Sequence, residues 1–77
     1  MDGWKVELDF ESENSGRVKL LARLDGRGQP EFAATSGAFV GVVPFRVKPD
    51  GTAEFRLIRQ VTVPPETITT LLNKLGV

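Results

Sequence analysis

The strongest constraint on the fold is an unbroken alternation of apolar and polar residues near the start of the chain, in the stretch Trp4 to Phe10, WKVELDF. Apolar side chains occupy every second position, with charged residues between them. A period of two is typical of a β-strand that buries one face and exposes the other. Arg17 to Leu24 repeats the pattern after the polar, turn-rich residues 11–16. We therefore predict two strands joined in a hairpin.

Turn signals divide the middle of the chain into three further strands. Asp25 to Pro30 and Pro49-Asp50-Gly51 are rich in glycine, proline and aspartate, which favour tight turns. Pro44 interrupts one of the segments between them. Because proline donates no hydrogen bond to a strand ladder, it indicates an edge strand or a bulge there. The expected strands span residues 31–35, 38–48 and 53–63.

The last residues change from the period of a strand to that of a helix. Ile68, Leu71, Leu72 and Leu75 follow the spacing i, i+3, i+4, i+7, which places them on one helical face. Pro65 suits the first turn and Gly76 can end the helix. So short a helix is marginal in water by itself, so we expect its leucine face to dock on the sheet.

Together these elements predict an α+β fold in one small domain, residues 1–77. The expected order is β-β-β-β-β-α: an antiparallel five-stranded sheet, or a small half-open barrel, with one C-terminal helix packed on it. The pattern leaves the strand order open.

Composition argues against several kinds of chemistry. The chain has no Cys, His or Tyr, which removes disulfides, the usual zinc ligands, the commonest general base, the thiolate nucleophile and the phenol. We expect no metal, no cofactor and no catalysis; an uncharacterised enzyme is the third of three functional hypotheses. No signal peptide and no run of some 20 apolar residues is visible, so the expectation is a cytoplasmic protein that does not enter a membrane.

Alternation assigns every strand residue to one of two faces. We expect the helix to cover one set of apolar side chains, namely Trp4, Val6, Leu8, Val18, Leu20, Leu24, Val43, Phe45, Val47, Phe55 and Leu57. The opposite face would then carry four apolar residues, Leu21, Val40, Val42 and Ile58. An outward apolar patch marks protein contacts. The first functional hypothesis is therefore protein binding, with a homodimer formed through the face or edge of the apolar strand 38–43. The alternative is that a bulge at Pro44, or a closed barrel, turns Val40 and Val42 into the core.

The same opposite face collects basic side chains, which raises a second functional hypothesis. Lys19, Arg23, Arg46, Lys48 and Arg56 could form a stripe that binds nucleic acid or another polyanion. The alternative is that these bases pair with acids on neighbouring strands, since ten basic residues are balanced by ten acidic ones. No aromatic residue is interleaved with them to stack on bases.

Overall fold

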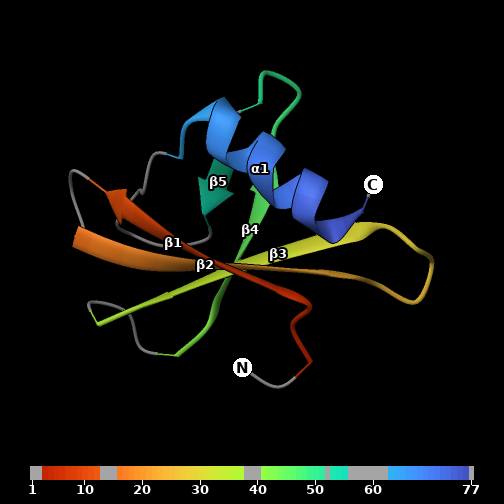
Figure 1. The fold of residues 1–77 in the computed structure, drawn as a ribbon, viewed down its shortest axis with the longest axis horizontal. Helices are drawn as coiled ribbons and strands as arrows, with labels where there is room; N and C mark the ends of the chain where they lie inside the picture. Colours follow the sequence, from red (N-terminus) through yellow and green to blue (C-terminus); the bar gives the residue numbers. More distant parts are fainter. Residues whose placement is uncertain (1–2, 13–15, 38–40, 52, 56–62, 77) are drawn as a thin grey trace.

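The computed structural model describes residues 3–12, 16–37, 41–51, 53–55 and 63–76. It is an α+β fold, an antiparallel sheet with one helix at the C-terminal end lying across it, as the sequence predicts (Figure 1). No helix in this part of the chain is long and apolar enough to span a membrane.

The sheet is a meander in which each strand pairs with the next along the chain, in the order β1-β2-β3-β4-β5. The expected strand 53–63 corresponds to β5, which is three residues long, and residues 56–62 lie outside the described part. The predicted length of that strand therefore stays a prediction, as does the choice between open sheet and half-open barrel. The strands are β1 (Val6–Ser12), β2 (Gly16–Leu24), β3 (Pro30–Ser36), β4 (Val43–Val47) and β5 (Ala53–Phe55).

The helix α1 spans Pro65–Leu75 and lies against β1 and β2. Pro65 occupies its first turn, where a missing N–H costs no helical hydrogen bond. Gly76 ends it in the left-handed conformation, with φ 91°, and its N–H reaches the carbonyls of Leu72 and Asn73. Ile68, Leu71 and Leu75 are buried against the sheet, so the predicted helical face is confirmed.

The face of the sheet that α1 covers holds the core, and most of the expected core residues of β1, β2 and β4 lie on it. The expected set named no residue of β3, although Phe32 and Ala34 belong to this face, and the expected core residue Leu57 lies outside the described residues. Two of the expected core residues are in other places. Leu24, at the end of β2, is 39% exposed. Trp4 precedes β1 and stacks on Arg23, on the opposite face. The buried core residues of the sheet are Val6, Val18, Leu20, Ala22, Ala34, Val43, Phe45, Ala53 and Phe55, with Leu8, Phe10, Phe32 and Val47 packed against them.

A tight turn between β2 and β3 sets their register. The Asp25 side-chain oxygen Oδ1 accepts hydrogen bonds from the backbone N–H groups of Arg27 and Gln29, both at 2.8 Å. The Asp25 N–H in turn donates to the Gln29 carbonyl at 2.8 Å. This closed turn places Arg23 directly opposite Glu31 across the two strands. The turn thus positions a charged pair that forms part of the site described below.

The two glycines of this turn provide a matched test, since a Cβ added at either meets nothing within 4 Å. Gly28 has φ +78°, where side chains are strained, whereas Gly26 has an ordinary φ. We expect Gly28→Ala to lower the free energy of unfolding by about 1–2 kcal/mol in urea titrations. Gly26→Ala should leave it unchanged or raise it by up to about 1 kcal/mol. Equal losses in both variants would contradict the account of the turn.

Candidate binding site

The predicted interface residues have different surroundings in the structure. Leu21 belongs to the outer face, the face of the sheet away from α1, as alternation predicts, but it has no exposed surface. Its cross-strand partners on that face are Glu7 and Ala33. The expectation that Leu21 forms part of an exposed patch is therefore wrong, because a central strand has neighbours on both sides. Val42 is 39% exposed, which agrees with the first of the two alternatives, but it precedes β4, which begins at Val43, so the described part of the expected strand 38–43 is a strand only at its last residue. Val40 and Ile58 lie outside the described residues.

Three bases of the outer face are paired with acids on neighbouring strands. Nε of Arg17 lies 3.7 Å from Glu11, Nζ of Lys19 lies 3.5 Å from Glu7, and Nε of Arg23 lies 2.7 Å from Glu31. Arg46 and Lys48 are exposed, and the register sets Arg46 opposite Glu54. Arg56 lies outside the described residues. Bases on this face therefore alternate with acids and form no continuous basic stripe within the described sheet.

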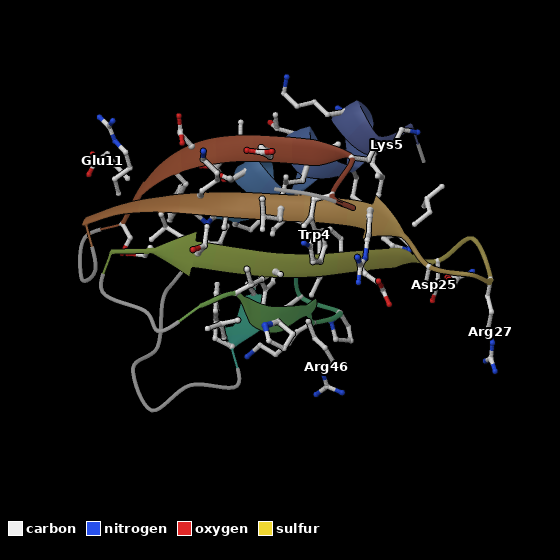
Figure 2. All side chains as sticks on the ribbon, turned by 90° about the horizontal axis from the view of Figure 1, so that it is seen from below. Trp4, Lys5, Glu11, Asp25, Arg27 and Arg46 are labelled. Atoms are coloured by element: carbon white, nitrogen blue, oxygen red, sulfur yellow. The ribbon has the colours of Figure 1, made fainter. Side chains whose placement is uncertain are left out.

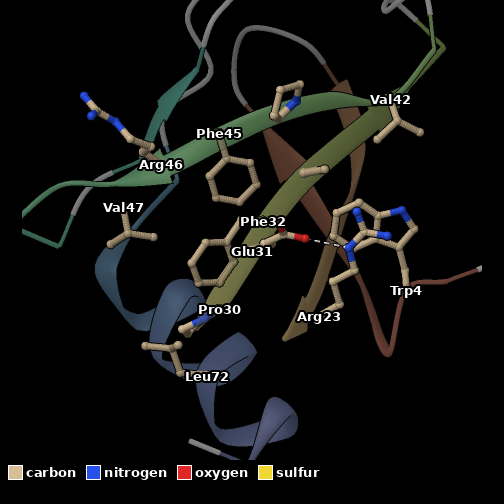
Figure 3. Close-up of a pocket in the computed structure, with 12 residues that line it drawn as sticks. Trp4, Arg23, Pro30, Glu31, Phe32, Val42, Phe45, Arg46, Val47 and Leu72 are labelled. Atoms are coloured by element: carbon tan, nitrogen blue, oxygen red, sulfur yellow. Dashed lines mark hydrogen bonds and ion pairs between the residues drawn. The ribbon is translucent and has the colours of Figure 1, made fainter. Parts of the chain in front are cut away.

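A pocket opens where β3 and β4 diverge. Their pairing covers three residue pairs and stops at Phe32 opposite Phe45, although β3 begins at Pro30 and β4 continues to Val47. Pro30 has no N–H to give to a ladder, and strand twist adds to the separation. We call this divergence the fork. Rings that belong to the core can be reached from the outer face through the fork (Figure 3).

The fork pocket has a volume of about 620 Å³, which is within the usual range for small-molecule sites. Its walls come from the start of the chain, from β2, β3 and β4, and from α1. Most lining side chains are apolar, and its charged members are two arginines and one glutamate. The lining residues are Trp4, Arg23, Pro30, Glu31, Phe32, Ala33, Val42, Pro44, Phe45, Arg46, Val47 and Leu72.

One wall of the pocket is a stack of Trp4, Arg23 and Glu31. The guanidinium carbon of Arg23 lies 4.2 Å from the centre of the Trp4 ring, and its Nε donates to Oε2 of Glu31 at 2.7 Å. Trp4 lies over Arg23 because the chain turns at Gly3, which has φ 84°. Two residues later the Lys5 N–H donates a hydrogen bond to the Ala22 carbonyl, which ties the chain to β2. Figure 2 shows Trp4 over β2 and β3, on the side away from α1. The positive charge of Arg23 is thus held between an aromatic face and a carboxylate.

The other wall is the accessible end of a column of three phenylalanines. The ring centres of Phe32 and Phe45 are 5.4 Å apart, and those of Phe45 and Phe55 are 4.7 Å apart, with interplanar angles of 21° and 23°. Phe45 and Phe55 are buried, whereas Phe32 is half-buried. Phe32 therefore presents an aromatic surface at the fork.

No protein-family model, no curated protein and no solved structure matches this chain. Within the described residues, no group of three or more acidic side chains lies close enough together to hold a metal ion.

Sequence reasoning missed most of this pocket. It assigned Val42 to the outer face and Arg23 and Arg46 to a basic stripe, but it gave Trp4 to the core and had no role for Phe32. The alternation wrongly placed Trp4 on the core face, because the strand β1 begins two residues later, at Val6. Gly3 was the available signal, since a glycine beside an alternating run can end the alternation. Pro30, which lies at the fork, was expected only as part of a turn.

The Trp4–Arg23–Glu31 stack should contribute measurably to stability, unlike the more exposed ion pair between Arg17 and Glu11. We expect Arg23→Gln to lower the free energy of unfolding by about 1 kcal/mol, since it removes both a stacked cation and a short ion pair. Arg17→Gln is the matched control, because that pair is 3.7 Å apart and its side chains are 76% and 73% exposed. Its loss should cost less than about 0.5 kcal/mol. Urea unfolding followed by circular dichroism measures both, and equal losses would contradict a special role for the stack.

Proposed function

We propose that this chain is a non-catalytic, cytoplasmic protein-binding domain whose first partner is a second copy of itself. The observation that supports this is Val42, a large apolar side chain that stays 39% exposed beside the apolar lining of the fork pocket. Exposed apolar surface next to a hollow, rimmed by charge, is typical of contact sites between proteins. The absence of Cys fits a reducing compartment.

Two properties of the chain favour a second copy as the partner. Its ten basic and ten acidic residues cancel, so two copies do not repel each other through net charge. A chain of 77 residues buries a limited core, and association is a common way for small domains to gain stability. In a two-fold dimer the same patch serves both copies, so Val42 of each copy would pack against the corresponding patch of the other.

Leu24 provides a matched control for Val42, since both are 39% exposed and Leu24 does not line the pocket. We expect sedimentation velocity at micromolar concentration to give twice the monomer mass for the native chain. Val42→Asp should weaken association by at least about tenfold, because it places a charge in an apolar contact, whereas Leu24→Asp should not. A monomer that persists on concentration would overturn the homodimer.

A mobility-shift assay with single-stranded DNA tests the hypothesis that the chain binds nucleic acid or another polyanion. Because three of the basic residues are paired with acids, we expect no shift at about 50 mM salt, where phosphate contacts are strong. A salt-sensitive shift that Arg46→Glu abolishes would replace protein binding with polyanion binding as the proposed function.

A further inference from the structure

The lining of the fork pocket is mostly aromatic and apolar, and its charged side chains already have partners within the protein. The chain has five Phe and one Trp, and three of these six aromatic rings, Trp4, Phe32 and Phe45, line the pocket. Figure 3 shows these rings around the place where β3 and β4 diverge. We propose that the pocket binds a neutral, planar molecule of two fused aromatic rings, which is a ligand beyond the protein contact proposed above.

The aromatic character of the ligand follows from the rings at the fork. The ring centres of Phe32 and Phe45 are 5.4 Å apart with an interplanar angle of 21°, and a further aromatic ring can join such a pair through offset or edge contacts. Phe32 is half-buried, so part of its ring surface contacts solvent. A flat ligand ring that covers this surface gains aromatic contacts that a saturated ring of the same size does not make.

The neutrality of the ligand follows from the charges of the lining. Arg23 and Glu31 form an ion pair at 2.7 Å, and the guanidinium of Arg23 also lies 4.2 Å from the centre of the Trp4 ring. Arg46, the third charged residue of the lining, has an interaction within the protein as well. A charged ligand would lose hydration and find each opposite charge already paired, whereas a neutral ligand has little hydration to lose.

The size and rigidity of the ligand follow from the shape of the pocket. Its volume of about 620 Å³ is ample for two fused rings. It is open to solvent along one side, where Val42, Pro44 and Arg46 are exposed. A flexible alkyl chain would lose rotational freedom in such an open site, whereas fused rings have none to lose.

The test is a titration of the full chain with coumarin, a neutral molecule of two fused planar rings, followed by proton–nitrogen correlation spectra. The single Trp gives one indole N–H signal, which reports on the pocket directly. We expect saturable shifts of the Trp4 indole and of the Phe32 and Val47 amides, with a dissociation constant on the order of 1 mM for a ligand of this size. Shifts that grow without saturation, or that gather at Lys19 and Thr35, which line a separate hollow, would overturn the proposal.

Two analogues test the two properties of the ligand on the native chain. Octahydrocoumarin is neutral but has lost the aromatic rings, and coumarin-3-carboxylate keeps the rings but adds a negative charge. Each should bind at least about threefold more weakly than coumarin. Equal or tighter binding of the saturated molecule would overturn the role of the rings, and equal or tighter binding of the carboxylate would overturn the neutrality of the site.

Two variants with the same substitution then locate the aromatic contact. Phe32→Leu, which keeps the pocket apolar, should weaken coumarin binding about threefold or more. Phe10→Leu is the control, because Phe10 also packs against the core but does not line the pocket, and it should leave binding unchanged. Equal effects of the two substitutions would overturn the proposal. A homodimer observed without saturable coumarin binding would overturn this inference alone, and coumarin binding by a strict monomer would overturn the dimer alone.

Discussion

The register of β2 with the strands on both sides of it is the constraint on which the rest of the structure depends. β2 pairs along its length with β1 and with β3. The register sends Val18, Leu20 and Ala22 towards α1 and Leu21 to the other face. A slip of one residue would exchange the two sets, because strand side chains alternate. The turn at Asp25 holds the register of β2 and β3 and so brings Arg23 to Glu31.

At the fork the situation is the opposite, because the pairing of β3 with β4 is short and leaves apolar side chains accessible to solvent. β3 and β4 share three residue pairs, whereas β2 and β3 share seven. Where the ladder ends, strands that would otherwise cover the core separate, and Phe32 becomes half-exposed between them. Among the described residues, no helix or strand packs over the outer face of the sheet at this point. Part of the apolar lining of the fork pocket therefore consists of side chains that also belong to the core or pack against it, namely Phe32, Phe45, Val47 and Leu72.

Much of the fold could be predicted from the sequence, because its alternations are regular. The period of two in β1 and β2, and the change to a helical period at Pro65, give the element types and the core face. The sequence could not show that Leu21 is fully covered, since that depends on neighbours in space rather than on parity. Nor could it place Trp4, because alternation says nothing once a strand has ended. The candidate site depends on these two kinds of information, which is why sequence reasoning found Val42 and the arginines but not the pocket.

The position of Trp4 also determines what tryptophan fluorescence measures in this molecule. In many small domains a single tryptophan lies in the core, and its emission follows the loss of the whole structure. Here the indole rests on Arg23 outside the core cluster, at the point where the chain enters β1. The fluorescence of Trp4 therefore reports whether the first residues contact the sheet. The far-ultraviolet circular dichroism of the strands and α1 reports whether the fold as a whole is intact. The two signals report on different parts of the molecule, and they coincide during unfolding if the first residues leave the sheet together with the rest of the fold.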